Sequence, residues 1–307
     1  MRILIVGFGS IGTRHFDVLS GLYPDSEIAI VSRHSSHKNV KYKTIDEVED
    51  LRKYDYYVIA SETSLHEEQL RKIDEVARGK KILVEKPLFA RPGKFRPVNN
   101  VVFVGYNLRY HPLVEYVRNI SSKVISVSVF TGQYLPNWRP GSDYSKSYSA
   151  SIEQGGGVLL DLSHEIDYIQ NLFGNLLVTG AVGGKISDLR IVTEDYASFV
   201  GVVGGRTKIS ITVEYLSRIP IRAMHVNTVD GTYIADFIQG TMKIKTEGMQ
   251  EMEELQMGCK RNYTYSRMHR DIIEGEGSVA CSYEQGCSVL EVVSRIKNLM
   301  GWSEHGK

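Results

Sequence analysis

The chain has few cysteines, and none of its apolar runs is long. Its three cysteines, Cys259, Cys281 and Cys287, follow no CxxC spacing. They therefore argue against a disulfide framework or a zinc site and favour a reducing compartment. The apolar runs fall well short of the roughly 20 residues of a membrane span, and the first residues lack the cleavage site of a signal peptide. We therefore expect a cytoplasmic protein with no membrane partner.

The sequence also lacks an excess of either charge. Its 37 Lys and Arg residues balance 36 Asp and Glu residues, for a formal net charge of +1. This balance gives no reason to expect a nucleic-acid partner. The nine histidines show no HxxxH spacing, so we expect no bound metal. At 307 residues the length suits two domains or one large one.

Strand-like and helix-like segments alternate through the first third of the chain. An apolar run at residues 3–6 precedes a glycine turn and an amphipathic segment. The later strand-like runs are "EIAIVS", "YDYYVIAS" and "KILVE", and helix-like segments at 44–51 and 64–80 lie between them. This alternation predicts parallel strands and a doubly wound α/β fold.

The glycine turn, "GFGSIG", has the spacing of a dinucleotide-binding turn. Gly7 allows a tight turn, Gly9 lets the backbone approach a pyrophosphate, and Gly12 lets the helix pack close to the strand. The helix N-terminus then offers free N–H groups to the phosphates. The alternative is a glycine-rich turn with no ligand. The expected cofactor contacts in the turn are Gly7, Phe8, Gly9, Ser10, Ile11 and Gly12.

The end of the second strand favours NADP over NAD. NAD-binding folds usually carry Asp or Glu there, whereas this chain has Ser32 and Arg33. Arg33 would attract a 2′-phosphate, and Ser32, Ser35 or Ser36 could donate hydrogen bonds to it. We therefore expect NADP to be preferred, with NAD as the other option. The alternative is that Arg33 stacks on the adenine or faces solvent.

Four motifs occur in a familiar order: "VGFGSIGTRH", "HEEQLRKIDEVARGKKILVEKP", "VGYNLRYHP" and "GGGVLLDLSHEIDYI". The sequence resembles the Gfo/Idh/MocA family of sugar-type oxidoreductases over essentially its whole length. The resemblance implies a dinucleotide-binding Rossmann domain at 1–118. It also implies an α+β domain at 119–307 with a large, mostly antiparallel sheet, and the final helical segment has the option of packing back on the first domain. That sheet commonly packs against another subunit in the family, which implies a homodimer or homotetramer.

The resemblance makes Lys86 the first catalytic candidate. In the family the matching lysine lies near the nicotinamide and the reacting carbon of the substrate. A partly desolvated lysine there can accept or deliver the proton that accompanies hydride transfer. Glu85 would anchor the lysine or contact the ribose, and a cis Lys86–Pro87 bond is expected. On composition alone, the simpler alternative is a strand that runs into a surface loop with two solvated charges. The resemblance also implies cofactor contacts from Ser61, Glu62 and His66.

The block "EQGGGVLLDLSHEIDY" supplies the other catalytic candidates. Asp161 and His164 are three residues apart, so they would share one face of a helix expected at 159–172. By resemblance, His164 would hydrogen-bond the reacting hydroxyl or serve as a proton donor, and Asp161 would orient the substrate or tune Lys86. Many family members have three residues between this pair, and this chain has two. Either the helix begins with a shifted turn or Glu165 takes the usual place. The three glycines of the block would let backbone approach the substrate or cofactor.

The remaining candidates concern the substrate. The family uses the region of "VGYNLRYHP" for substrate, and a polar, aromatic loop follows at 133–150, where such loops are more often functional than structural. The substrate-binding candidates are Tyr106, Asn107, Arg109, Tyr134, Trp138 and Glu165.

Together these features predict an NAD(P)-dependent oxidoreductase that acts on a hydroxyl or ketone of a sugar, amino sugar or nucleotide-activated sugar. The "DLSHEIDY" variant resembles members from bacterial surface-polysaccharide gene sets. Two alternatives stay open: a sugar epimerase or glycosidase that recycles its cofactor, and a non-catalytic, NADP-sensing regulator on the same scaffold.

Overall fold

The computed structural model describes residues 1–33 and 36–302. The chain forms two compact units. The first comprises Met1–Asn107 and Arg261–Ser288, and the second comprises Leu108–Lys260 and Val289–Lys307. The helix α7 (Tyr283–Leu299) contributes residues to both units. The expected division of labour, with the cofactor bound by 1–118 and the substrate by 119–307, stays a prediction.

The first unit is built on a seven-stranded sheet in the order β15-β6-β5-β4-β1-β2-β3. The strands are β1 (Arg2–Val6), β2 (Glu27–Val31), β3 (Val40–Tyr42), β4 (Tyr56–Ile59), β5 (Lys81–Val84), β6 (Val101–Val104) and β15 (Cys281–Ser282). All neighbours pair in parallel except β15 and β6. The order 3-2-1-4-5-6 is that of the dinucleotide-binding doubly wound fold, so the expected Rossmann architecture is confirmed.

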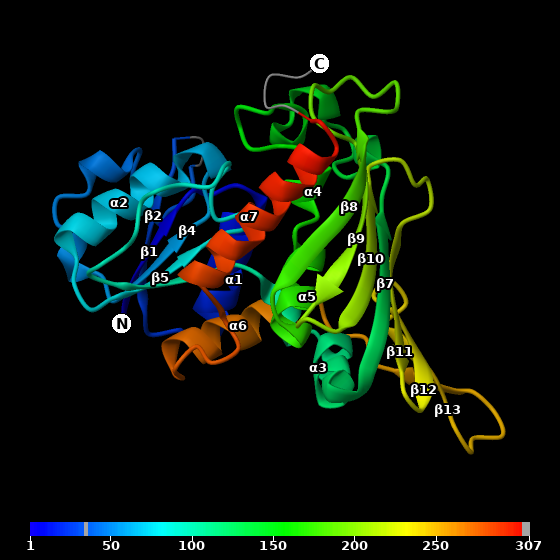
Figure 1. The fold of residues 1–307 in the computed structure, drawn as a ribbon. Helices are drawn as coiled ribbons and strands as arrows, with labels where there is room; N and C mark the ends of the chain where they lie inside the picture. The colour runs from blue at the N-terminus through cyan, green and yellow to red at the C-terminus, as the bar shows by residue number, and fades with distance from the viewer. Residues whose placement is uncertain (34–35, 303–307) are drawn as a thin grey trace. The chain divides into compact units, whose positions relative to one another are not determined.

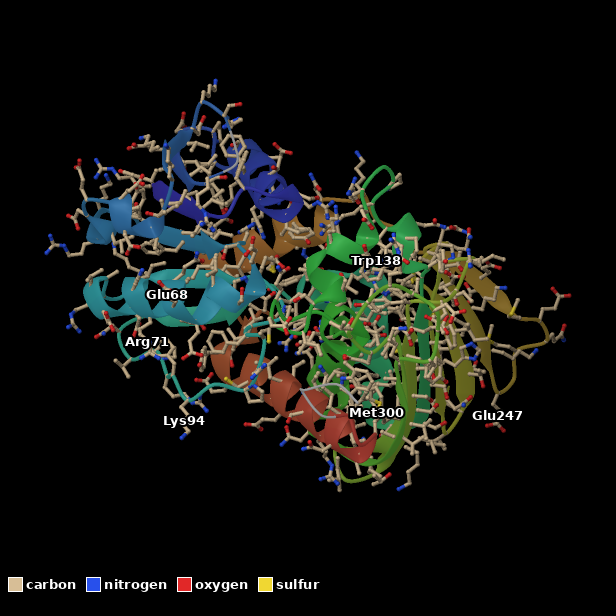
Figure 2. All side chains as sticks on the ribbon, turned by 90° about the horizontal axis from the view of Figure 1, so that it is seen from above. Glu68, Arg71, Lys94, Trp138, Glu247 and Met300 are labelled. Atoms are coloured by element: carbon tan, nitrogen blue, oxygen red, sulfur yellow. The ribbon has the colours of Figure 1, made fainter. Side chains whose placement is uncertain are left out.

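Helices α1 (Ser10–Leu22), α2 (His66–Val76) and α6 (Tyr263–Ile273) belong to this unit. Helix α2 buries Leu70 and Ile73, whereas Glu68 and Arg71, labelled in Figure 2, are exposed on its other side. Strands β1, β4 and β5 lie side by side in Figure 1. Their apolar residues are buried on both faces, as a parallel sheet covered by helices requires.

The helix expected at 44–51 is not formed. The segment instead contains two short 3₁₀ turns, η1 (Ile45–Glu47) and η2 (Leu51–Lys53). Val48 and Asp50 between them have extended backbone angles. The Asp50 carboxylate accepts a hydrogen bond from the Arg52 N–H, so it caps a new turn where a continuous helix would have passed through.

The second unit is built on an eight-stranded sheet in the order β14-β13-β12-β11-β7-β10-β9-β8. The strands are β7 (Val124–Gly132), β8 (Leu176–Gly184), β9 (Tyr196–Val203), β10 (Thr207–Glu214), β11 (Ile221–Thr228), β12 (Gly231–Asp236), β13 (Thr241–Thr246) and β14 (Glu253–Gln256). Strands β7 and β10 pair in parallel, and the other neighbours are antiparallel. The predicted large, mostly antiparallel sheet is therefore confirmed (Figure 1).

Helices α3 (Pro112–Ile120), α4 (Val158–Asp161) and α5 (His164–Phe173) pack on one side of this sheet. Along β7, Val127 and Val129 are buried under them, while Ser128 and Phe130 are exposed on the opposite face. The remaining 3₁₀ turns are η3 (Thr63–Leu65), η4 (Asn107–Tyr110), η5 (Ser121–Lys123), η6 (Leu135–Asn137), η7 (Tyr144–Lys146) and η8 (Tyr148–Ala150). Among the residues that the structure describes, no helix is long and apolar enough to cross a membrane.

Candidate functional site

Of the three glycines in the turn after β1, only Gly9 has open space beside it. Gly7 has a φ of 96°, and a Cβ there would collide with the backbone of Ala60 and Ser61. A Cβ on Gly12 would collide with the Gly7 carbonyl. A Cβ on Gly9 would meet nothing within 4 Å, although Gly9 is the N-cap of α1. The chain therefore requires Gly7 and Gly12 for its own packing and leaves room at Gly9, which fits a phosphate group held on the helix N-terminus.

The loop after β2 packs against this turn. The His37 ring lies 5.2 Å from the Phe8 ring and 4.8 Å from the Phe16 ring, centroid to centroid. Arg33 is exposed at the start of this loop, and the Ser32 N–H donates to the Tyr42 carbonyl. Ser35, one of the expected donors to a 2′-phosphate, lies outside the described residues. The loop that carries Arg33 is therefore tied to the glycine turn by aromatic contacts.

The residues after β4 contact the loop that follows β5. His66 is buried, and its Nε2 lies 3.2 Å from the Ser61 carbonyl oxygen. Its Nδ1 lies 3.2 Å from the carbonyl oxygens of Pro87 and Leu88. Burial lowers the pKa of His66. These contacts give His66 a role in joining the loops after β4 and β5. Its expected contact with a cofactor, and those of Ser61 and the exposed Glu62, stay predictions.

Glu85 and Lys86 follow β5 at the carboxyl edge of the parallel sheet. Glu85 is buried, and its two carboxylate oxygens have different partners. One lies 2.9 Å from His15 Nε2, and the other accepts the Lys86 backbone N–H at 3.0 Å. Lys86 is half-buried, and its peptide bond to Pro87 is cis, as expected. The pair is therefore not the end of a solvated surface loop, because Glu85 is fixed from inside the unit.

Asp161, in the second unit, is held by two tyrosines. The Tyr215 hydroxyl donates to Asp161 Oδ2 at 2.5 Å, and the Tyr148 hydroxyl also bonds the Asp161 side chain. Burial and the Asp161 charge raise the pKa of Tyr215 well above its ordinary value. The Asp161 charge and burial raise the pKa of Tyr148 as well. Both phenols therefore stay protonated and donate to the carboxylate. Neither tyrosine was singled out from the sequence, because both are distant from Asp161 along the chain.

The single helix expected at 159–172 is wrong. Helix α4 ends at Asp161, and α5 begins at His164. Leu162 leaves the helical region, with φ −103° and ψ 33°, and the Ser163 hydroxyl donates to the Leu160 carbonyl at 2.8 Å. This bond ends the first helix, so Asp161 and His164 do not share the face of one continuous helix. His164 is half-buried in the first turn of α5.

Glu165 points into the sheet. It is fully buried, accepts a hydrogen bond from the Thr131 hydroxyl at 2.9 Å, and has Arg222 Nε at 2.9 Å from the same oxygen. These partners come from β7 and from β11, so Glu165 ties α5 to the sheet. The arrangement favours His164 over Glu165 as the residue that faces a substrate, and both assignments stay predictions.

The glycines of the same block pack against the chain itself. A Cβ on Gly156 would collide with the Tyr148 carbonyl, and one on Gly157 would collide with the Glu194 carboxylate. The Val158 N–H donates to the Glu194 carbonyl at 3.0 Å. The expected close approach of backbone is therefore present, but its partners are residues 148 and 194 of this chain.

Arg109, an expected substrate ligand, forms a buried ion pair. Its side chain is 2% exposed and donates to both carboxylate oxygens of Asp167, with a shortest distance of 2.6 Å. Asn107, in the first unit, donates to the Thr264 hydroxyl at 2.7 Å, and Tyr106 is buried. The burial of Arg109 argues against its predicted contact with a substrate carboxylate or phosphate.

Aromatic residues of the 133–150 loop gather near Tyr215. Trp138, labelled in Figure 2, packs edge-to-face on the Tyr215 ring at 5.3 Å. The Arg218 guanidinium lies 3.5 Å from the centre of the Tyr134 ring. Trp138 thus packs this loop against Tyr215, the partner of Asp161. Within residues 1–33 and 36–302, no group of three or more His, Cys, Asp or Glu side chains is placed to hold a metal ion.

Residues 1–102 match the family model GFO_IDH_MocA, described as an oxidoreductase family with an NAD-binding Rossmann fold. The first third of the chain is therefore similar to the Gfo/Idh/MocA oxidoreductase family. This match confirms the resemblance found in the sequence motifs and establishes an NAD-binding oxidoreductase fold. No curated protein matches the chain by sequence.

Several solved structures of Gfo/Idh/MocA type share the fold over nearly the whole chain. UDP-N-acetylglucosamine 3-dehydrogenase GnnA from Acidithiobacillus ferrooxidans is 18% identical, with a TM-score of 0.78 and 98% of each chain covered. The WlbA dehydrogenase from Bordetella pertussis, solved with NADH and UDP-GlcNAcA, is 16% identical, with a TM-score of 0.74 and 98% of this chain and 96% of that chain covered. Levoglucosan dehydrogenase, solved with NADH and levoglucosan, is 15% identical, with a TM-score of 0.80 and coverages of 98% and 97%. At these identities the likeness establishes the fold of both units.

Proposed function

We propose that this chain is an NAD(P)-dependent dehydrogenase or reductase. It would transfer a hydride between nicotinamide and a hydroxyl or ketone carbon of a sugar, amino sugar or nucleotide-activated sugar. The observation that carries the proposal is the position of Lys86. It is half-buried at the carboxyl edge of the sheet, just after β5, which lies two places from β1 and its glycine turn. At the usual strand spacing this is about 10 Å, a distance that a bound dinucleotide can cover.

The protein's own part in the reaction is proton transfer and orientation. A bound nicotinamide supplies the acceptor or donor of the hydride. When the carbon of a hydroxyl group loses a hydride, its oxygen must also lose a proton, and the neutral amine of Lys86 would accept it. In the reverse direction the Lys86 ammonium returns that proton to the ketone oxygen. Glu85 keeps the lysine backbone in place through its bond to the Lys86 N–H.

Asp161 and His164 belong to the second unit, and both are proposed as catalytic residues. Because two phenols donate to it, the Asp161 carboxylate is fixed in one orientation and can bind a substrate hydroxyl. His164 would hydrogen-bond the reacting oxygen. The solved dehydrogenases with this fold include enzymes named for UDP-N-acetylglucosamine and for levoglucosan, which supports a carbohydrate substrate.

NADP is proposed as the preferred cofactor, with NAD as the other option. The support is the absence of a carboxylate at Ser32 and Arg33, together with the exposed Arg33 in a loop packed on the glycine turn. Two of the compared structures hold NADH, which supports the other option. The ratio of kcat/KM for NADPH and NADH decides between them, and Arg33→Asp should shift that ratio toward NADH.

The decisive experiment compares Lys86→Ala with Lys94→Ala. Lys94 is an exposed lysine of the same unit (Figure 2) and serves as the control. The wild-type protein is first screened with NADPH, NADH and their oxidised forms over a panel of sugars and nucleotide sugars. We expect Lys86→Ala to lose at least about a hundredfold in turnover, the usual contribution of a general acid–base. Cofactor binding, followed by nicotinamide fluorescence, should persist in both variants.

Full turnover in Lys86→Ala would refute the assigned role. Tight NADP binding by the wild-type protein with no turnover on any sugar would instead favour a cofactor-sensing regulator. A cofactor that stays bound through purification and is regenerated in each cycle would favour an epimerase or glycosidase.

A homodimer or homotetramer through the open face of the second sheet is also proposed. That face exposes Phe130, Leu177, Val200 and Ile221 on four strands. Light scattering on the wild-type protein should give twice or four times the 34.6 kDa chain mass. The variant Phe130→Asp should lower that mass.

A further inference from the structure

Behind Glu85, four buried side chains form a continuous chain of hydrogen bonds within the first unit. Glu85 Oε1 lies 2.9 Å from His15 Nε2, and His15 Nδ1 lies 2.8 Å from His269 Nε2. His269 Nδ1 lies 3.1 Å from the Tyr56 hydroxyl. The exposed fractions of the four residues lie between 0% and 7%. Water therefore does not compete for these bonds, and each atom must use the partner it faces.

The direction of the three bonds follows from the ends of the chain. An ionised Glu85 can only accept, so His15 Nε2 carries a hydrogen. Burial lowers the pKa of His269 well below its ordinary value, and burial raises the pKa of Tyr56. His269 is therefore neutral and Tyr56 is a donor. Since His15 Nε2 holds a hydrogen toward Glu85, His269 Nε2–H can donate to His15 Nδ1, and the Tyr56 hydroxyl can donate to His269 Nδ1. All three bonds then point toward Glu85.

These hydrogen bonds join residues from four separate parts of the sequence. His15 lies on α1, just after the glycine turn, and Glu85 follows β5. Tyr56 begins β4, where it pairs with Lys81 at the start of β5. The hydrogen bonds thus extend from the carboxyl edge of the sheet back along about four residues of a strand, or about 13 Å. His269 comes from α6, more than 180 residues after Glu85, and is the central member.

We propose that His15 and His269 are positioning residues for Lys86. This inference rests on the proposed function of Lys86. The bond from His269 places a donor at His15 Nδ1 and so stabilises, together with Glu85, the His15 tautomer whose hydrogen is on Nε2; only that tautomer can donate to Glu85. With the other tautomer, a ring lone pair would face the carboxylate. Glu85 would then turn away and release the Lys86 N–H that its second oxygen accepts.

Other polar groups face the histidine pair but do not enter the chain. The Tyr265 ring packs edge-on against His15 at 5.4 Å, and the Arg14 guanidinium lies over the Tyr265 ring. Tyr265 therefore offers a matched control. Tyr56→Phe and Tyr265→Phe each remove one phenol oxygen beside the histidines, but only Tyr56 donates to one of them.

The test uses the full-length protein with ¹⁵N-labelled histidine. In the wild-type protein, long-range ¹H–¹⁵N spectra should show His15 and His269 both protonated on Nε2. In His269→Leu, His15 should shift toward the Nδ1–H tautomer. Tyr56→Phe, which preserves packing, should shift the His269 signals, whereas Tyr265→Phe should leave both histidines unchanged.

Kinetics give the second readout. We expect kcat of His269→Leu to fall by between about tenfold and a hundredfold, the cost of losing one hydrogen bond to a charged group. The KM for the cofactor should stay within about twofold, because no cofactor contact is removed. His269→Gln, whose amide can still donate to His15, should restore part of kcat.

An unchanged His15 tautomer in both His269→Leu and Tyr56→Phe would overturn the inference, as would unchanged kcat in His269→Leu. If Lys86→Ala were fully active, the proposed function would fail while the tautomer measurements could still stand. The two failures are therefore distinguishable.

Discussion

At the scale of single residues, the carboxylate of Asp161 is defined by its two phenol partners. Tyr215 lies directly after β10, and Tyr148 lies in η8 of the aromatic loop. Their hydroxyls meet on one side chain because the Gly156 backbone lies against the carbonyl of Tyr148. The orientation of Asp161 therefore depends on the fold of the loop as well as on its own helix.

We predict that Tyr215→Phe and Tyr148→Phe each lower kcat and that their effects are not additive. Either phenol alone can still orient Asp161, so the double variant should lose more than the product of the single losses. Removing a donor from a buried carboxylate should also cost about 1–3 kcal/mol of stability. Steady-state kinetics and urea unfolding measure the two effects.

Tyr144→Phe is the control, because Tyr144 lies in the same loop as Tyr148 but its hydroxyl accepts from the Arg190 N–H. If the loss in kcat of the double variant equals the product of the two single losses, the tyrosines do not act through their shared partner Asp161.

From the sequence, polar residues can be placed at strand ends more readily than their hydrogen-bond partners can be predicted. Lys86 and Glu85 follow an apolar run, and their position on a sheet edge could be expected from the alternating pattern. The bonds from Glu85 to His15, and from His15 to His269, join residues 70 and 254 positions apart. No local sequence pattern predicts hydrogen bonds between residues so far apart. Arg109 shows the same limit, since its buried partner Asp167 is 58 residues away.

At the scale of elements, the turn from β1 into α1 contains one glycine with no room for a side chain and one with open space beside it. Gly12 is closed off by the Gly7 carbonyl, whereas Gly9 faces open space. The two positions look alike in the sequence motif, and only the structure distinguishes what each one costs to change.

We predict opposite outcomes for Gly9→Ala and Gly12→Ala. Gly9→Ala should leave the thermal midpoint within about 1 °C, because its methyl group meets no neighbour, but should weaken cofactor binding at least about tenfold. Gly12→Ala should lower stability by roughly 1–3 kcal/mol through overpacking. Thermal unfolding without cofactor and fluorescence titration with NADPH separate the two effects. Normal cofactor affinity in Gly9→Ala would argue that the open space is not the phosphate site.

Element boundaries were predictable where hydrophobic periodicity is strong and wrong where a polar side chain caps a turn. The central strands of the first sheet follow short apolar runs, and β7, β9 and β10 of the second sheet follow apolar alternation. The expected helix at 159–172 breaks because the Ser163 hydroxyl bonds back to the Leu160 carbonyl. This break depends on a single side chain, whose effect a periodic pattern averages out.

At the scale of the whole molecule, buried neutral histidines make stability depend on pH. Burial lowers the pKa of His66, His111 and His269, in the case of His111 to about 4. The unfolded chain takes up these protons near pH 6.5, whereas the folded chain does not. Stability is therefore fully present above pH 6.5 and is lost as pH falls below it.

We predict that His111→Asn flattens this dependence. Burial and the nearby Arg222 charge keep His111 neutral, and its Nδ1 accepts the Leu113 N–H at the start of α3. Asn can provide the same cap without titrating. The wild-type protein should lose up to roughly 3 kcal/mol from His111 as pH falls from 7 to 4. The variant should lose correspondingly less in urea unfolding measured at several pH values.

His225→Asn, at an exposed position of β11, should leave the pH dependence unchanged. An equal slope for the wild-type protein and His111→Asn would contradict the prediction.

The fold class could be predicted from the sequence because βα alternation and a glycine turn leave few topologies open. The return of the chain to the first sheet, through α6 and β15, could not be predicted. Strand β15 is only two residues long, Cys281 and Ser282, and α6 carries no motif that assigns it to either unit.

That return has a consequence for how the protein is made. A ribosome completes β1 to β6 before the chain is half finished, but the partners of β6 and His15 emerge only with residues 261–288. Until then the edge of β6 is unpaired and open to other chains. The first unit is thus begun first but completed only when residues 261–288 have emerged, after most of the second unit has been synthesised.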